Sequence, residues 1–242
     1  MMLEGKRVSK NFGGLRALRE VDFTVGRSDI VGLIGPNGSG KSTLFNVITG
    51  YLRADGGEIL FNGQEIAHHQ ADKIAKMGIA RTFQIVRPFR EMTVLRSIAV
   101  SALYGRAGRS KLSEGLQVAS KWADFCGLEK RTTTLAGELT LAEQKRLEIA
   151  RALALEPQIL LLDESLAGLT HVETAQGLEL IRRIRENLRI SVFMIEHVMK
   201  AMMRISDRII VLNEGRRIAE GTPEEIVKDE AVIEAYLGKA HT

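Results

Sequence analysis

Short, continuously apolar runs rich in Ile, Val and Leu recur along the chain, and segments with helical patterns separate them. Strands of a parallel sheet have this uniform apolar character, because helices cover both faces of the sheet. The alternation of the two patterns predicts an α/β fold with a mostly parallel sheet. The runs are Ile30–Ile34, Ile159–Asp163, Ser191–Ile195 and Arg208–Leu212.

A second group of strand patterns lies nearer the N-terminus. The apolar segments Val21–Val25 and Ile59–Phe61 precede the pair Asn62-Gly63, which favours a tight hairpin turn. These segments therefore predict an N-terminal layer of antiparallel strands. The sequence Asn213-Glu214-Gly215 predicts a further hairpin near the C-terminus.

From Phe89 to about Gly137 the pattern changes to amphipathic helical stretches with few strand signals. A chain of 242 residues is long for one small domain and short for two, so we expect one α/β core that carries one sizeable insertion. The predicted organisation is a core over residues 1–84 and 146–242, with a helical insertion over residues 85–145.

Composition agrees with an ordinary globular protein, with 45% hydrophobic and 26% charged residues. The longest apolar runs are far shorter than the ~18 residues of a membrane span. The first residues place charges where a signal peptide needs an apolar stretch, and the lone Cys126 excludes a disulfide framework or a zinc cluster of paired cysteines. We therefore expect a cytoplasmic chain that does not itself cross a bilayer.

The net charge of +4 is located in one segment. Residues 85–145 contain ten Lys or Arg and six Asp or Glu, which gives +4, so the remainder of the chain is balanced. Two interpretations stay open for this basic insertion. It either faces a membrane, a nucleic acid or an acidic partner, or is simply a solvated helical surface.

The most specific motif is Gly-Pro-Asn-Gly-Ser-Gly-Lys-Ser-Thr, which follows a predicted strand and opens a predicted helix. It fits the P-loop pattern, in which glycines let main-chain N–H groups surround phosphates at a helix N-terminus. We expect Lys41 to reach the β and γ phosphates of ATP and Ser42 to hold Mg²⁺. The motif predicts a P-loop (RecA-like) core, with nucleotide contacts from Gly35, Pro36, Asn37, Gly38, Ser39, Gly40, Lys41, Ser42 and Thr43.

A pair of acidic residues ends the second apolar run, at the edge of a parallel sheet where ligands collect. Asp163 is suited to a role at Mg²⁺, and Glu164 is suited to polarising an attacking water. With the P-loop, this pair predicts ATP hydrolysis.

The order of these motifs resembles that of the nucleotide-binding subunits of ABC transporters over essentially the whole chain. Within that family it looks most like the ATPase subunits of branched-chain amino-acid importers. Three segments carry this closer likeness: ARTFQIVRPFREMTV, EQKRLEIARAL and IEHVMKAMMRISDRIIVLNEG.

The resemblance assigns roles to three further residues. Gln84 corresponds to the glutamine that senses Mg²⁺ and the attacking water, and His197 to the switch histidine that contacts the γ-phosphate. Phe12 corresponds to the aromatic residue that stacks on adenine, usually a tyrosine. Packing of Phe12 within the β layer is an equally open interpretation.

Two segments depart from the family pattern. The signature, usually Leu-Ser-Gly-Gly followed by Gln or Glu, is here Leu-Thr-Leu-Ala-Glu-Gln over residues 139–144. The resemblance implies that Thr140 and Ala142 contact the γ-phosphate of ATP held by a partner subunit, while Thr140 and Glu143 also form a predicted capping box. Downstream, Thr170 replaces the family's usual acidic residue or asparagine, in a segment that links the two ATP sites.

The family also implies partners. These are a second ATP-binding subunit, identical or different, and membrane-spanning permease subunits docked near Gln84, Phe89 and Met92. The expected chain is peripheral on the inner face of the cell membrane and powers import of branched-chain or other hydrophobic amino acids. The alternatives are the ATPase of a different ABC transporter, a soluble ABC ATPase acting on nucleic acid or the ribosome, and a P-loop kinase.

Overall fold

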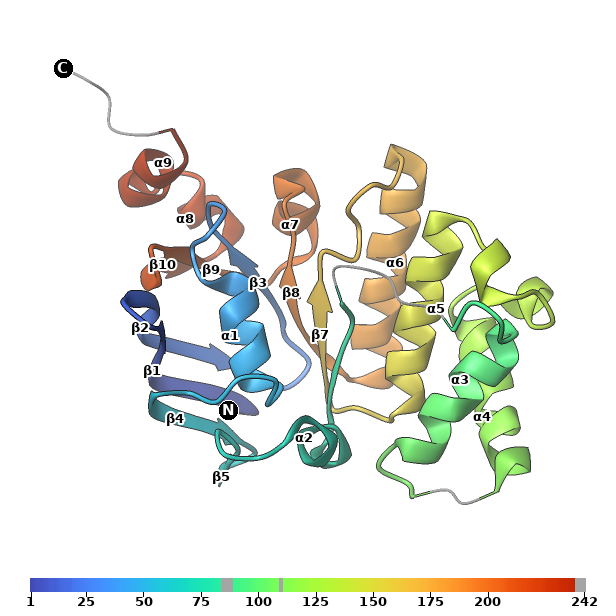
Figure 1. The fold of residues 1–242 in the computed structure, drawn as a ribbon. Coiled ribbons are helices and arrows are strands. Elements are labelled where there is room, and N and C mark those ends of the chain that lie inside the picture. Colours follow the sequence, from blue (N-terminus) through green and yellow to red (C-terminus); the bar gives the residue numbers. More distant parts are fainter. Residues whose placement is uncertain (84–88, 109–110, 238–242) are drawn as a thin grey trace. The chain divides into compact units, whose positions relative to one another are not determined.

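The structure is a computed structural model that describes residues 1–83, 89–108 and 111–237 (Figure 1). The chain forms two compact units. The first comprises Met1–Ile74 and Ser191–Thr242, and the second comprises Ala75–Ile190. Both mix strands and helices, as the α/β prediction requires. The helical insertion is expected to extend from residue 85 to residue 145, and these limits stay a prediction.

An antiparallel sheet begins the first unit, with strand order β2-β1-β4-β5. Along β2, the side chains of Val21, Phe23 and Val25 are buried and alternate with more exposed ones, the pattern of a strand with one covered face. Asn62 and Gly63 both have positive φ between β4 and β5, as a tight two-residue hairpin requires. This sheet confirms the predicted N-terminal layer. Its strands are β1 (Leu3–Phe12), β2 (Leu15–Val25), β4 (Gly56–Phe61) and β5 (Gln64–Glu65).

The remaining strands of the first unit follow the order β10-β9-β3-β8. β3 pairs in parallel with both β8 and β9, and β10 pairs with β9 through the predicted C-terminal hairpin. Every residue of β3 and β8 is buried, which explains their uninterrupted apolar sequences. The elements are β3 (Ile30–Ile34), β8 (Ser191–Ile195), β9 (Arg208–Asn213), β10 (Arg216–Gly221), α1 (Lys41–Ile48), α7 (Met199–Ile205), α8 (Pro223–Ile226) and α9 (Glu230–Leu237).

Three aromatic rings form the centre of this unit. The ring of Phe193 lies 5.9 Å from that of Phe23 and 5.1 Å from that of Phe45. These residues come from β8, β2 and α1, and all three are almost fully buried. Burial of such a side chain contributes about 1.5–3 kcal/mol, so the cluster fixes the antiparallel layer, the parallel strands and α1 to one another.

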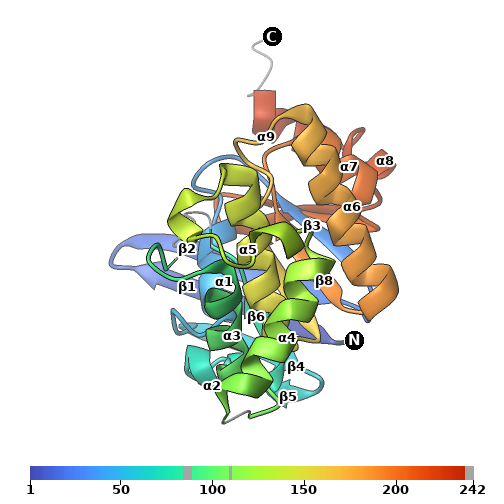
Figure 2. The same cartoon turned by 90° about the vertical axis from the view of Figure 1, so that its right-hand side faces the viewer.

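The second unit contains two parallel strands and most of the long helices. Figure 2 shows α3, α4 and α5 as neighbours, and contacts join all three pairs. Its described elements are β6 (Ile79–Arg81), β7 (Ile159–Asp163), α3 (Val94–Tyr104), α4 (Leu112–Phe125), α5 (Leu141–Ala154), α6 (His171–Leu188) and the 3₁₀ turns η1 (Glu129–Arg131) and η2 (Ala136–Glu138). The helix α2 (Ala71–Met77) contains the point where the chain leaves the first unit.

Three helices begin with the same local arrangement. Thr140, Thr170 and Thr222 are the N-caps of α5, α6 and α8, and each forms a capping box with the Glu three residues later. The threonine accepts a hydrogen bond from the Glu main-chain N–H, and the Glu carboxylate accepts one from the threonine N–H. Two of the main-chain N–H groups at each start are therefore satisfied by neighbouring residues.

Among the residues that the structure describes, no helix combines the length and the apolar character needed to span a membrane.

Candidate phosphate and nucleotide site

The predicted P-loop connects β3 to α1, and its glycines adopt conformations that other residues rarely take. Gly35, Gly38 and Gly40 have φ values of 151°, 78° and 105°. A side chain at Gly35 would overlap the carbonyl oxygen of Leu212, and one at Gly40 would lie 2.6 Å from the carbonyl oxygen of Ala17. Both the backbone conformation and the close packing therefore require glycine here.

Lys41 turns back toward its own loop. Its Nζ atom donates hydrogen bonds to the carbonyl oxygens of Gly35 and Pro36, at 2.8 and 2.9 Å, and lies 3.4 Å from Ser39 Oγ. The side chain is buried, with 6% of its surface exposed. The loop thus holds an ammonium group at its centre.

The start of α1 is favourable for an anion. Four main-chain N–H groups at a helix N-terminus lack helical partners, and the helix dipole places positive charge there. The first turn of α1 contains no acidic residue. Ser42 is exposed at this end, while Ser39 is buried within the loop. The geometry matches what a phosphate group requires.

Two other predicted nucleotide contacts belong to the first unit. Phe12 ends β1 with 46% of its surface exposed, and the Lys10 ammonium lies 5.7 Å from the centre of its ring. Its ring is therefore only partly covered, and part of it is open to solvent. His197 is exposed and follows β8, two residues beyond the last strand residue.

In the second unit, Asp163 ends β7 as predicted, and it is buried beside Arg81. The guanidinium donates a hydrogen bond to Oδ2 of Asp163 at 2.6 Å, and the main-chain N–H of Asp163 donates to Thr82 Oγ1 at 3.2 Å. Asp163 Oδ1 is buried and has no hydrogen-bond partner among the described residues. A buried carboxylate oxygen without a hydrogen-bond partner is suited to bind a hard cation.

Glu164 follows with a φ of 52°, in the left-handed region that costs an ordinary residue about 1–2 kcal/mol. Neighbouring side chains hold the main chain around it. Lys145 Nζ donates a hydrogen bond to the Glu164 carbonyl oxygen at 2.7 Å, and the hydroxyl groups of Thr82 and Ser165 lie 3.1 Å apart. The strained conformation is thus supported from α5 and from the end of β6.

The altered signature forms the first turn of α5. The Thr140 hydroxyl accepts a hydrogen bond from the Glu143 N–H at 3.3 Å, and the Glu143 carboxylate accepts one from the Thr140 N–H at 2.9 Å. Leu141 is exposed, whereas Ala142 has only 8% of its surface exposed. The capping interpretation of Thr140 is confirmed, and contact with a partner's nucleotide stays a prediction.

Thr170, which departs from the family pattern, has a local role at the start of α6. It caps α6, and hydrogen bonds from its main chain and hydroxyl group lower the pKa of the Glu173 carboxyl. Gln84 lies outside the described residues.

The structure groups the predicted residues within each unit. Gly35–Thr43, Phe12 and His197 belong to the first unit, and Asp163 and Glu164 belong to the second with Thr140 and Ala142. Sequence reasoning gave no role to Arg81, Thr82 or Lys145. A signal for Lys145 was present, because it shares one face of α5 with the buried residues Ala142 and Ile149.

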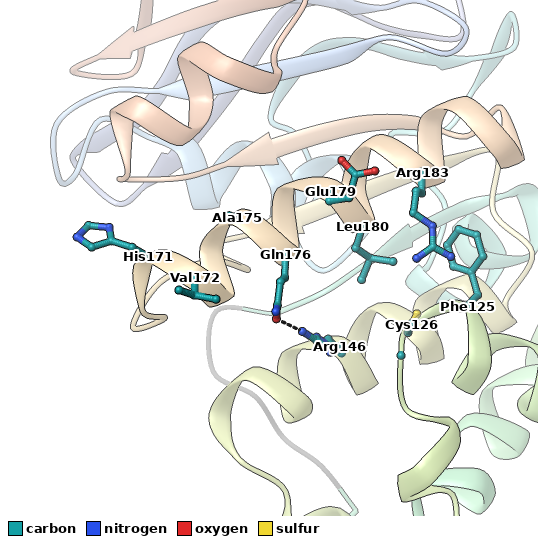
Figure 3. Close-up of a pocket in the computed structure, with 11 residues that line it drawn as sticks. Phe125, Cys126, Arg146, His171, Val172, Ala175, Gln176, Glu179, Leu180 and Arg183 are labelled. Carbon is teal, nitrogen blue, oxygen red and sulfur yellow. Dashed lines mark hydrogen bonds between the residues drawn. The ribbon is translucent and has the colours of Figure 1, made fainter.

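A hollow of about 760 Å³ lies in the second unit between the end of α4, α5 and α6 (Figure 3). Arg146 donates a hydrogen bond to Gln176 across it at 2.5 Å, and the Arg183 guanidinium lies 4.6 Å from the centre of the Phe125 ring. No residue predicted for the nucleotide site lines this hollow.

Comparison with known proteins gives consistent matches. A family model described as "ABC transporter" matches residues 18–167, and one described as "Branched-chain amino acid ATP-binding cassette transporter" matches residues 216–242. The chain is 43% identical over 241 residues to the high-affinity branched-chain amino acid transport ATP-binding protein LivG of Escherichia coli, covering 95% of this chain and 94% of that protein. It is 41% identical to BraF of Pseudomonas aeruginosa, which carries the same description, over 99% and 98% of the two chains.

Solved structures agree with the sequence matches. The ADP conformation of an ATP-binding cassette of an ABC transporter superimposes with a TM-score of 0.88 at 32% identity, over 98% of this chain and 99% of that one. A dimeric ATP-binding cassette in a post-hydrolysis state, bound to ADP and Pi, gives a TM-score of 0.82 at 25% identity, over 92% and 99%. Both the α/β fold class and the family resemblance are confirmed.

Proposed function

The chain belongs to the ABC transporter family of ATP-binding, ATP-hydrolysing subunits, and on that premise we propose that it powers an importer of branched-chain or other hydrophobic amino acids. Its similarity to LivG and BraF, whose names state branched-chain amino acid transport, supports this substrate class. The C-terminal match over residues 216–242 supports it as well.

The first unit binds the phosphates of ATP. The main-chain N–H groups from Gly35 to Thr43 and the start of α1 surround them, and Lys41 exchanges its bonds to loop carbonyls for bonds to the β and γ phosphates. Phe12 offers a partly exposed ring to adenine. His197 contacts the γ-phosphate, in keeping with its exposed position after β8.

Three residues are assigned to Mg²⁺. Ser42 is an exposed residue at the P-loop position whose hydroxyl binds Mg²⁺. Oδ1 of Asp163 is buried without a partner among the described residues, which fits a hard cation. Gln84 is assigned by family resemblance alone. When bound, Mg²⁺ neutralises charge on the phosphates.

Glu164 orients the water that attacks the γ-phosphorus. Phosphoryl transfer depends mainly on positioning and on electrostatic stabilisation, and the Glu164 main chain is held by Lys145 in a fixed, strained conformation. After hydrolysis, ADP and inorganic phosphate occupy the site that bound ATP.

The functional assembly is a dimer of ATP-binding subunits, either two copies or this chain with a related one. Thr140 and Ala142 lie in the first turn of α5, where free main-chain N–H groups favour an anion. This turn faces the γ-phosphate of the partner's ATP. Permease subunits dock near Gln84, Phe89 and Met92, so the chain is peripheral on the inner face of the membrane.

The observation that carries this proposal is the P-loop in which Lys41 is held by the carbonyl oxygens of Gly35 and Pro36. The test is uptake of labelled leucine into vesicles that contain the purified assembly with its copurifying permease. Glu164→Gln should bind ATP and form a stable closed dimer, but hydrolyse ATP only at a small residual rate and fail to support uptake. Glu179→Gln, the same substitution at an exposed site on α6, is the matched control. Undiminished turnover in Glu164→Gln would remove Glu164 from the catalytic role.

The altered signature implies unequal sites in a mixed dimer. Ala142 stands where the family has glycine, and its methyl group leaves less room for the partner's γ-phosphate. The site made by this signature and a partner's P-loop therefore hydrolyses ATP more slowly than the site of Lys41 and Glu164. Each rate is measured after the other P-loop lysine is replaced. Equal rates would contradict this assignment.

The basic composition of residues 85–145 supports one other candidate, an ABC ATPase that acts on nucleic acid. Binding to nucleic acid that weakens steeply with salt, together with no copurifying permease, would favour it.

A further inference from the structure

The side chain of Lys145 extends from the second turn of α5 into the protein. Only 7% of its surface is exposed, and its Nζ atom lies 2.7 Å from the carbonyl oxygen of Glu164. A hydrogen bond from an ammonium group is about twice as strong as a neutral one. The lysine therefore fixes the direction in which this carbonyl points.

The direction of that carbonyl matters because Glu164 has a φ of 52°. A residue other than glycine persists in this region only where its surroundings hold it. The carbonyl carbon and the side chain are both bonded to the α-carbon of Glu164. A hydrogen bond that holds the carbonyl group therefore restricts movement of this α-carbon, and with it the point from which the carboxylate side chain starts.

The segment after β7 meets α5 at a second point. A Cβ atom at Gly168 would lie 3.1 Å from Cδ2 of Leu141, so the first turn of α5 rests directly against this segment. Lys145 lies one turn further along the same helix. The helix that begins at Thr140 is thus connected to the segment of residues 164–168 at both of its first two turns.

We propose that Lys145 is a positioning residue for ATP hydrolysis, which acts through the Glu164 main chain and ties the location of α5 to that of the Glu164 carboxylate. The inference rests on the proposed function, because it gives Lys145 a role only if Glu164 orients water. Lys145 itself touches no phosphate in this scheme. It affects the chemical step and leaves ATP binding unchanged.

The test compares Lys145→Met, which keeps the length of the side chain without the donor, with Lys145→Arg and Lys145→Gln, which keep a donor. Lys130→Met is the control, since Lys130 is exposed on η1. We expect Lys145→Met to lower kcat about 10- to 100-fold, the effect of displacing a catalytic group by about 1 Å, while KM and the Kd for ATP change less than about twofold. At least one donor variant should recover most of kcat.

A double substitution separates positioning from a purely structural role. In the Glu164→Gln background, Lys145→Met should cause no further loss of the residual rate, because both changes act on one group. Wild-type kcat in Lys145→Met, or an additional loss in the double variant, would overturn the inference. If Glu164→Gln alone kept full turnover, the proposed role of Glu164 would fall instead. Urea unfolding of each variant confirms that the rates refer to folded protein.

Discussion

The guanidinium group of Arg81 lies 2.6 Å from Oδ2 of Asp163, and both side chains are almost completely buried. The pair joins the last residue of β6 to the last residue of β7 and leaves Oδ1 of the carboxylate without a partner among the described residues. Oδ2 of Asp163 thus stabilises the fold through its ion pair with Arg81, and Oδ1 is suited to bind a metal cation.

Arg81→Met should destabilise the chain strongly, because it leaves the Asp163 carboxylate buried without the guanidinium group that balances its charge. Loss of one partner of a buried pair costs about 3–5 kcal/mol. The measurement is the midpoint of urea unfolding at constant m value. The double variant Arg81→Met/Asp163→Asn should be less destabilised than the sum of the single ones. If the losses of unfolding free energy in the two single variants simply add up in the double variant, the two side chains do not stabilise each other.

Lys41→Met should reduce the affinity for ATP about 10- to 100-fold, since a hydrogen bond to a charged group contributes about 1.5–3 kcal/mol. Equilibrium binding of labelled ATP measures the change, with Lys130→Met as a control for an exposed lysine. Wild-type affinity in Lys41→Met would show that the loop binds its ligand without the ammonium group.

Thr140→Ala should cost about 1 kcal/mol of stability, the usual effect of losing an N-cap side chain. Thr140→Ser should keep stability, because the serine hydroxyl can accept the same hydrogen bond from Glu143. Urea unfolding distinguishes the two. An equal loss in both variants would mean that the threonine methyl group, rather than the cap, stabilises this turn.

Cys126 should react slowly with thiol reagents in the folded chain. Burial raises the pKa of its thiol from 9.0 to about 12, against the opposing effect of Arg183 and Arg146. Because the thiolate is the reacting species, labelling at pH 8 should be on the order of a thousandfold slower than in the unfolded chain. Comparable rates in urea and in buffer would contradict the buried position.

The same pKa difference makes stability depend on alkaline pH. The unfolded chain releases the thiol proton first, so the contribution of Cys126 is fully present below pH 9 and is lost as pH rises toward about 12. Stability of Cys126→Ala should therefore decline less steeply over that window, measured as the unfolding free energy at several pH values.

Much of the site was predictable because its requirements are local. The spacing from Gly35 to Ser42 specifies a loop whose glycines and helix start are adjacent in sequence, and the structure gives these glycines positive φ where the chain turns. The Asn62-Gly63 turn and the Thr140 cap are local in the same way. Such features depend on a few neighbouring residues, and their chemistry is visible in the sequence.

The contacts of Arg81 and Lys145 were not predictable in this way. Arg81 meets a residue 82 positions later, and Lys145 meets one 19 positions later. Such pairs depend on how β6, β7 and α5 pack, and a single sequence does not specify that packing. Gln84 lies outside the described residues, so its assigned role is still a prediction.

The capping boxes of Thr140, Thr170 and Thr222 have a consequence for motion. Each helix start is stabilised by residues of the same helix, so its hydrogen bonds do not depend on what lies opposite. A nucleotide or subunit that pushes on α5 or α6 would then displace the helix as a whole rather than unwind its first turn. Hydrogen exchange at the capped N–H groups, those of the threonine and of the Glu three residues later, should stay equally slow whether or not nucleotide is present.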